Sequence, residues 1–288
     1  MNKFYFLVLL FLISCKTEPD NKYLVYQNII ILSDMSSRLT NLPLKDTNQI
    51  FLIVDSFKTE CVKPGKKIGD RSSIFFSTFS GRLSASIDIE KIKNLGEKQQ
   101  FINSTGEYRK SGLDQKIGEF KTSVTNIYKT TRDPGLDLIS MLIEKIENDP
   151  IVKKESYIPN GIDTTFINYN NTIYIFTDGY LEYLDKGKNA QFYFGENEIE
   201  KIRSYCIANN VDIQAALEAN KALCLPPYKS EMNKIINLHI LETHERDKYL
   251  RLMSYDNKAG QRDNEILEAV WKKWAFDSGF KNCEWDKY

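Results

Sequence analysis

An unbroken apolar run, Ile29–Leu32, is the feature that most constrains the fold of this chain. It ends abruptly in a polar cluster that begins with Ser33 and Asp34. A short apolar run without alternation is typical of a strand that is buried on both faces, in a sheet covered by helices. A second run of this kind, at 172–177, also ends in a carboxylate, Asp178. Because ligands bind at the carboxyl ends of strands in open α/β sheets, these two strands predict a binding site.

Predicted strands and helices alternate along the chain. Strands are predicted at 27–32, 73–79, 83–89, 172–177, 234–241 and 283–285. Apolar spacing predicts helices at 48–57, 134–148, 198–209, 212–222 and 263–279, the second of them capped by Asp133 with Pro134 at its first position. This order predicts the α/β class, with a three-layer, doubly wound, mostly parallel sheet, one antiparallel edge strand and long insertions.

The N-terminus carries the pattern of a secretory signal. A basic start precedes an apolar stretch, Phe4–Ile13, which is too short to remain as a helix that spans a bilayer. The sequence Leu-Ile-Ser-Cys, which ends at Cys15, resembles the bacterial lipobox. In that motif the signal is removed and the cysteine is lipidated, which holds a protein at a membrane surface. The alternative is an ordinary signal peptide with an incidental cysteine.

The resemblance to the lipobox implies a lipid-anchored protein of the cell envelope. Lys16, rather than an aspartate, follows Cys15, and this favours the outer membrane, or the periplasmic face, of a Gram-negative cell. The predicted division is a signal peptide at 1–14, a polar tether at 15–24, and a single domain at 25–288 with an insertion of mixed helix and loop at about 90–129.

Charge and motifs exclude several classes of function. The 39 Lys and Arg residues balance the 39 Asp and Glu residues, so no global field favours nucleic acid as a partner. The chain contains no G-x-S-x-G nucleophile elbow, P-loop or G-x-G-x-x-G motif. Their absence argues against the common hydrolase and nucleotide-binding classes.

Four cysteines follow Cys15, namely Cys61, Cys206, Cys224 and Cys283. None forms a C-x-x-C pair, so a structural zinc site of that type is not expected. An even number of cysteines outside the cytoplasm permits disulfides, with three possible pairings. Buried free thiols are the alternative, and the sequence leaves both interpretations open.

Carboxylate and hydroxyl side chains gather at three predicted strand or helix ends, namely Asp34, Ser36, Thr130, Thr131 and Asp178. The first two follow the first strand, the threonines precede the predicted helix at 134–148, and Asp178 follows the fourth strand. This arrangement resembles a von Willebrand factor A-like domain. That family carries D-x-S-x-S after its first strand, a threonine before a middle helix and an aspartate after its fourth strand, and together these residues bind a metal ion.

The resemblance implies a non-catalytic domain that binds a protein or peptide partner, whose carboxylate completes the coordination of Mg²⁺, Mn²⁺ or Ca²⁺. The chemistry of the residues agrees with this expectation. The first and fourth strands of a doubly wound sheet lie side by side, so Asp34 and Asp178 are expected to face each other. Carboxylate and hydroxyl oxygens are ligands for hard divalent ions, and two adjacent carboxylates need a cation or a proton between them.

The chain departs from the family motif at Arg38, which replaces the second serine. A guanidinium does not ligate a metal. In one interpretation Arg38 points away, and Ser37 or a water completes a metal site. In another it pairs with Asp34 or Asp178, and the fold serves as a metal-free scaffold. In a third the serines only bond the backbone of a tight turn and the family assignment does not apply.

Weaker candidates are the two histidines and a second enzyme class. His239 lies within the predicted strand at 234–241 and is expected to be a sheet residue, whereas His244 follows that strand near the predicted site. Asp34 after a buried strand is also compatible with a haloacid-dehalogenase-like phosphohydrolase, in which an aspartate is the nucleophile. That family carries a second aspartate two residues later, where this chain has Ser36, so a binding protein is the preferred prediction and an enzyme is not.

Overall fold

The structure is a computed structural model, and it describes residues 21–36, 43–66, 70–133, 135–160, 163–183, 191–242, 245–249, 254–255 and 260–287. The chain forms two compact units. The larger unit comprises Tyr26–Lys153 and Tyr169–Tyr288, and the smaller unit comprises Met1–Val25 and Lys154–Asn168. The candidate site described below lies entirely within the larger unit.

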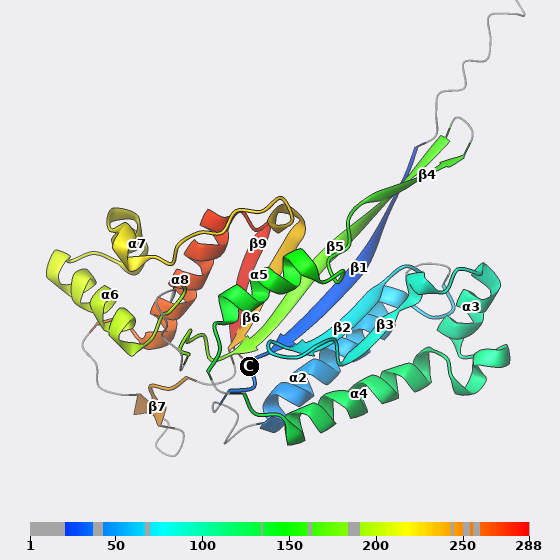
Figure 1. The fold of residues 1–288 in the computed structure, drawn as a ribbon, viewed down its shortest axis with the longest axis horizontal. Coiled ribbons are helices and arrows are strands. Elements are labelled where there is room, and N and C mark those ends of the chain that lie inside the picture. The colour runs from blue at the N-terminus through cyan, green and yellow to red at the C-terminus, as the bar shows by residue number, and fades with distance from the viewer. Residues whose placement is uncertain are drawn as a thin grey trace, which may run out of the picture. The chain divides into compact units, whose positions relative to one another are not determined.

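A seven-stranded sheet has the order β3-β2-β1-β5-β6-β9, with β4 paired to β5 (Figure 1). The strands are β1 Lys22–Ser33, β2 Ser73–Thr78, β3 Ala85–Asp88, β4 Ser156–Asn160, β5 Asp163–Thr177, β6 Ile236–Glu242 and β9 Asn282–Lys287, and a separate pair is formed by β7 Lys248–Tyr249 and β8 Ser254–Tyr255. β3 is antiparallel to β2, whereas β1 with β2, β5 with β6 and β6 with β9 are parallel. The predicted α/β class with a mostly parallel sheet and an antiparallel edge strand is confirmed.

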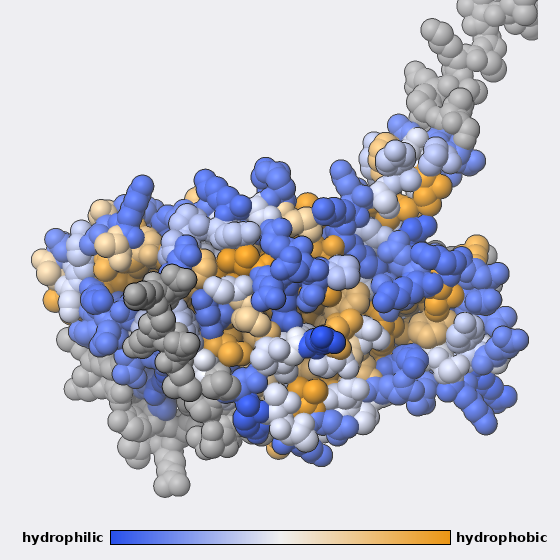
Figure 2. All heavy atoms as spheres, viewed as in Figure 1, coloured by the Kyte–Doolittle hydropathy of each residue, from blue (hydrophilic) through white to orange (hydrophobic). Residues whose placement is uncertain are grey.

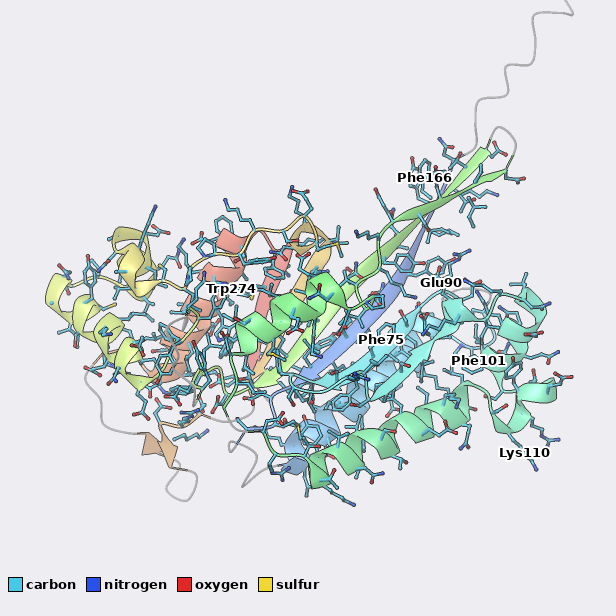
Figure 3. The ribbon with its side chains drawn as sticks, viewed as in Figure 1. Phe75, Glu90, Phe101, Lys110, Phe166 and Trp274 are labelled. Atoms are coloured by element: carbon cyan, nitrogen blue, oxygen red, sulfur yellow. The ribbon has the colours of Figure 1, made fainter. Side chains whose placement is uncertain are left out.

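Helices cover both faces of the sheet. They are α2 Pro43–Ser56, α3 Leu95–Asn103, α4 Leu113–Thr130, α5 Leu138–Asn148, α6 Glu196–Asn209, α7 Ile213–Ala219 and α8 Asp263–Ser278, with short helical turns at Phe57–Val62, Ile89–Lys91, Gly106–Lys110, Lys221–Leu223 and Asn233–Ile235. One apolar cluster joins the sheet to α5, α6, α7 and α8, and a second joins it to α2, α3 and α4. Phe75 and Trp274 belong to the first cluster and Phe101 to the second (Figure 3).

The apolar run of β1, Ile29–Leu32, contributes side chains to both apolar clusters. Ile30 and Leu32 belong to one, and Ile29 and Ile31 to the other, because successive side chains of a strand point to opposite faces. All four residues are buried. The run is therefore unbroken because this strand has helices on both sides, as its sequence predicted.

The carboxyl ends of the central strands lie level with one another. Ser33 of β1 is opposite Thr78 of β2, and Thr177 of β5 is opposite Glu242 of β6. Directly after β1, the backbone N–H of Asp34 donates to the carbonyl of Phe176 at 2.9 Å. The polar residues that follow β1, β5 and β6 are therefore brought to the same edge of the sheet.

The middle helix begins later than predicted. α5 begins at Leu138, and Asp137 caps it by accepting a hydrogen bond from the N–H of Ser140 at 3.0 Å. Asp133, the predicted cap, instead donates its backbone N–H to the carbonyl of Met35 and accepts a hydrogen bond from Ser80 Oγ. The prediction at Asp133 was wrong because that residue fastens the connecting segment to the strand ends. Pro134 lies outside the described residues.

Within the smaller unit, β4 pairs with the first residues of β5, from Ser156 opposite Ile167 to Asn160 opposite Asp163. The ring of Tyr23 stacks on that of Phe166, with centroids 5.0 Å apart (Figure 3). Apolar side chains of this unit, including Tyr157, remain exposed, and Figure 2 shows apolar surface along it. Among the residues that the structure describes, none belongs to a helix long and apolar enough to cross a membrane.

The four cysteines within the described residues, Cys61, Cys206, Cys224 and Cys283, are free thiols. Cys206 is buried in α6, and the other three are partly buried. Of the two interpretations that the sequence left open, the structure shows the free thiols and none of the three pairings.

Candidate functional site

Asp34 follows β1 and is held in a tight turn. Its carboxylate accepts hydrogen bonds from the backbone N–H of Ser36 at 2.9 Å, from Ser36 Oγ at 3.1 Å and from Thr177 Oγ1 at 3.3 Å. Only 4% of Asp34 is exposed. These donors satisfy a buried carboxylate and fix its direction.

Asp178 follows β5 and is also buried, at 1% exposure. Its Oδ1 accepts a hydrogen bond from the N–H of Tyr180 at 3.3 Å. The chain turns at Gly179, whose φ is +86° and where a Cβ would lie 2.6 Å from Trp285 Cη2. A residue with a side chain would be strained at this turn and would meet the Trp285 ring.

The two aspartates line one cavity of about 350 Å³. Its lining residues come from the segments that follow β1, β5 and β6 and from the segment that precedes α5, namely Asp34, Ser36, Gly135, Leu136, Leu138, Asp178, Tyr180, Glu182, Tyr183, Tyr193 and Arg246. Among the described lining residues, three carry carboxylates, one carries a guanidinium and three carry phenol rings.

Arg246, in the turn after β6, is the principal cation of this cavity. Its Nε donates to Asp178 Oδ2 at 2.8 Å, and a terminal nitrogen lies 2.5 Å from a Glu182 oxygen. The guanidinium carbon lies 3.8 Å from the centroid of the Tyr180 ring. Burial opposes the charge of Arg246, but Asp178 and Glu182 more than offset burial and raise its pKa. Arg246 therefore neutralises Asp178 within the described structure.

Tyr180 connects the cavity to the helices behind it. Its hydroxyl donates to Asp263 Oδ2 at 3.0 Å, and Asp263 in turn pairs with the buried guanidinium of Arg203 on α6. Burial, followed by the nearby Asp263 carboxylate, raises the pKa of Tyr180. The phenol is therefore neutral at physiological pH and presents its ring to Arg246 as a fixed surface.

The structure brings together some of the predicted site residues and not others. Asp34, Ser36 and Asp178 line the cavity, whereas Thr130 and Thr131 are not among its described lining residues. Thr130 is the last residue of α4, and its hydroxyl donates to the carbonyl of Asn126 at 2.8 Å. Gly135 and Leu136 occupy the place in the cavity that the resemblance assigned to a threonine. The structure does not describe Cys15, Ser37, Arg38 or His244.

The sequence analysis did not identify two charged residues at this end of the sheet, Arg246 and Glu242. Arg246 lies in a polar segment without periodicity, and no sequence signal marks it. Glu242, in contrast, ends the buried strand β6 as the aspartates follow β1 and β5, and that pattern was available. Its carboxylate is buried and accepts a hydrogen bond from Trp285 Nε1 at 2.9 Å. Burial is the main cause that raises the pKa of Glu242 to about 7.

The donor set fits the metal ion implied by the family resemblance only in part. Asp34 and Ser36 offer adjacent oxygens that suit a hard divalent ion. Asp178, however, is engaged by Arg246 through Oδ2 and by the Tyr180 N–H through Oδ1. A divalent ion bound by both aspartates would have to displace the guanidinium, since like charges so close together repel each other strongly. In the described arrangement Asp178 is therefore held by Arg246, and Asp34 and Ser36 are the residues whose oxygens suit the ion.

A comparison with models of known protein families finds no match for this chain, and a comparison with curated proteins finds none either. The α/β fold with a mostly parallel, mixed sheet is established by the strand order and registers.

Proposed function

We propose that this chain is a non-catalytic, lipid-anchored protein of the cell envelope that binds a protein or peptide partner in the cavity of Asp34 and Asp178. The observation that carries the proposal is the meeting of these two buried carboxylates in one cavity at the carboxyl end of the sheet. Ligands of open α/β sheets bind at this end. The lipobox-like sequence at Cys15 supports the lipid anchor.

The fold and the position of the aspartates are those expected of a von Willebrand factor A-like domain, and we propose that the chain has this ancestry. Under this proposal, Asp178 no longer serves as a metal ligand as it does in the family, because Arg246 supplies the positive charge that balances it. We therefore favour the metal-free scaffold over an Mg²⁺, Mn²⁺ or Ca²⁺ site. Arg38, for which the sequence suggested the role of counter-ion, lies outside the described residues; among the described residues Arg246 pairs with Asp178.

The chemistry of the cavity indicates the group that it accepts. Asp34, Asp178 and Glu182 contribute three carboxylates to the described lining, and Arg246 pairs with Asp178 and Glu182. Tyrosine rings stabilise cations that approach their faces. A lysine or arginine side chain of the partner fits a cavity lined by carboxylates and aromatic rings.

Site-specific photo-crosslinking in intact cells tests the proposed binding site. A photoreactive residue at Tyr193, in the cavity wall, is expected to form an adduct with a partner protein. The matched control places the same residue at Leu52 on α2, which is 63% exposed and outside the cavity lining. The adduct should disappear when Asp34→Asn and Asp178→Asn are combined in a chain that keeps its circular dichroism spectrum. An unchanged adduct would exclude the cavity as the binding site.

A thermal-shift experiment with Ca²⁺ and Mg²⁺ separates the metal-free mode from the ion-dependent mode. The wild-type Tm is expected to stay constant, whereas Arg246→Gln, which frees Asp178, is expected to gain stabilisation by Mg²⁺. Ligand at about one hundred times its Kd stabilises a folded protein by about 2.7 kcal/mol, so binding would be easy to detect. A wild-type Tm that rises with either ion, and does not rise in Asp34→Ala, would establish the ion-dependent mode instead.

A further inference from the structure

His239, Glu284 and Asp286 form a cluster of metal-ligating side chains on strands β6 and β9. One ligand atom of each lies within 4.8 Å of the other two. His239 Nδ1 is 3.2 Å from Glu284 Oε2 and 4.0 Å from Asp286 Oδ2. None of the three lines the cavity of Asp34 and Asp178.

The strand register places these side chains on one face of the sheet. His239 of β6 is paired with Tyr174 of β5 on one side and with Glu284 of β9 on the other, and Asp286 lies two residues beyond Glu284 on the same face. The His239 ring packs against that of Tyr174, with centroids 5.0 Å apart, and Asn282 Nδ2 donates to Glu284 Oε1 at 2.8 Å. Two of the three ligands therefore have a neighbour that fixes their orientation.

This part of the sheet face remains open. The apolar cluster on this face is the one that joins the sheet to α2, α3 and α4. Among the described residues, it includes Leu241 as its single residue from β6 and no residue from β9. The side chains of Glu284 and Asp286 are 50% and 61% exposed. An ion from solution can therefore reach the cluster without any opening of the fold.

The charge of the cluster is not balanced by the lysines or arginines that the structure describes. Among the described basic side chains, only the His239 ring lies within 4.0 Å of these carboxylates. Lys287, the neighbouring lysine of β9, is directed to Glu245, at 3.1 Å. Two carboxylates and a neutral imidazole carry two negative charges, which equal the charge of one divalent ion.

We propose that His239, Glu284 and Asp286 bind a divalent transition-metal ion such as Zn²⁺. Ligand atoms of a tetrahedral zinc site with bonds of about 2.0–2.2 Å lie roughly 3.4 Å apart, and the separations from His239, 3.2 Å and 4.0 Å, lie on either side of this value. The imidazole selects Zn²⁺ and similar ions over Mg²⁺ and Ca²⁺, which prefer oxygen ligands alone. Three protein ligands leave a position for water or for a ligand from a partner.

Zinc titration of the full-length protein by calorimetry tests the proposal. One equivalent of Zn²⁺ is expected to bind to the wild type, and Mg²⁺ is expected not to compete. Glu284→Gln and Asp286→Asn keep the shape of each side chain and are expected to weaken Zn²⁺ binding at least tenfold. Asp34→Asn, in the separate cavity, should leave Zn²⁺ binding unchanged. This control also makes the result independent of the proposed partner-binding function.

X-ray absorption at the zinc edge identifies the ligands directly. Nitrogen and oxygen at about 2.0–2.2 Å are expected, whereas a thiolate would appear at about 2.3 Å. Sulfur in the coordination sphere would assign the ion to a cysteine and overturn the proposal. Zinc affinity that is the same in wild type, Glu284→Gln and Asp286→Asn would also overturn it.

Discussion

At the scale of single residues, burial controls the chemistry of the sheet's carboxyl end. Glu242 is held among apolar neighbours, where desolvation raises its pKa from 4.5 to about 7, while the Trp285 hydrogen bond and Lys287 oppose the shift. The unfolded chain releases this proton near pH 4.5, but the folded chain retains it until about pH 7. The contribution of Glu242 to the free energy of unfolding is therefore fully present below the unfolded-state pKa of 4.5. It is lost as the pH rises through the folded-state pKa of about 7.

The variant Glu242→Gln is predicted to remove this pH dependence. Between roughly pH 5 and pH 8 the free energy of unfolding of the wild type should fall by about 2 kcal/mol more than that of the variant. Urea unfolding at a series of pH values measures the difference. Glu231→Gln, at an exposed glutamate, is the control and should follow the wild type. Parallel curves for wild type and Glu242→Gln would show that Glu242 is ionised in the folded chain at neutral pH.

At the scale of elements, α4 shows how a polar composition can conceal a core helix. Residues 90–129 were predicted as an insertion of mixed helix and loop, yet one face of α4 is buried against the sheet. That face comprises Leu113, Ile117, Phe120, Val124 and Tyr128. The spacing of three and four residues was present in the sequence but was masked by the lysines, threonines and glycine between these positions.

Truncation of this face is predicted to be costly. Phe120 is almost fully buried, so Phe120→Ala should lower the free energy of unfolding by about 3–5 kcal/mol through lost burial and the cavity left behind. Thr122→Ala, on the exposed face of the same helix, should change it by less than about 0.5 kcal/mol. Denaturant unfolding of both variants provides the test. Equal effects would mean that α4 does not contribute to the core.

The sequence predicted those parts of the fold that depend on local pattern. Apolar segments located β1, β5 and β6, and the acidic residues after the first two located Asp34 and Asp178. The local sequence pattern did not predict contacts between segments that are distant in the chain. The start of α5 depends on whether Asp133 bonds to Met35 or to its own helix, and only the folded chain decides this. Arg246 reaches Asp178 through a turn whose geometry no local pattern encodes.

At the scale of the whole molecule, the four cysteines that the structure describes are free thiols, although we propose an envelope location where oxidation favours disulfides. Burial raises the pKa of Cys61 to about 11 and that of Cys283 to about 12. Because the thiolate is the reactive form, these thiols are protected in the folded chain both from oxidation and from thiol exchange.

Thiol titration is predicted to show this protection. At about pH 8 the native protein should react slowly with a disulfide reagent, and the unreduced but unfolded protein should reveal all four thiols at Cys61, Cys206, Cys224 and Cys283. A reductant should leave the Tm unchanged. Fewer than four reactive thiols in the unreduced, unfolded chain would show that a disulfide forms in solution.

The strands at the two ends of the order β3-β2-β1-β5-β6-β9 have a consequence under the proposed lipid anchor, which would hold many copies of this chain on one membrane. β3, at one border, is only four residues long, and β9, at the other, carries the exposed acidic side chains of Glu284 and Asp286. Short or charged borders resist the addition of a strand from another molecule. Lipid-anchored proteins crowd together in two dimensions, and these borders would discourage such neighbours from aggregating edge to edge.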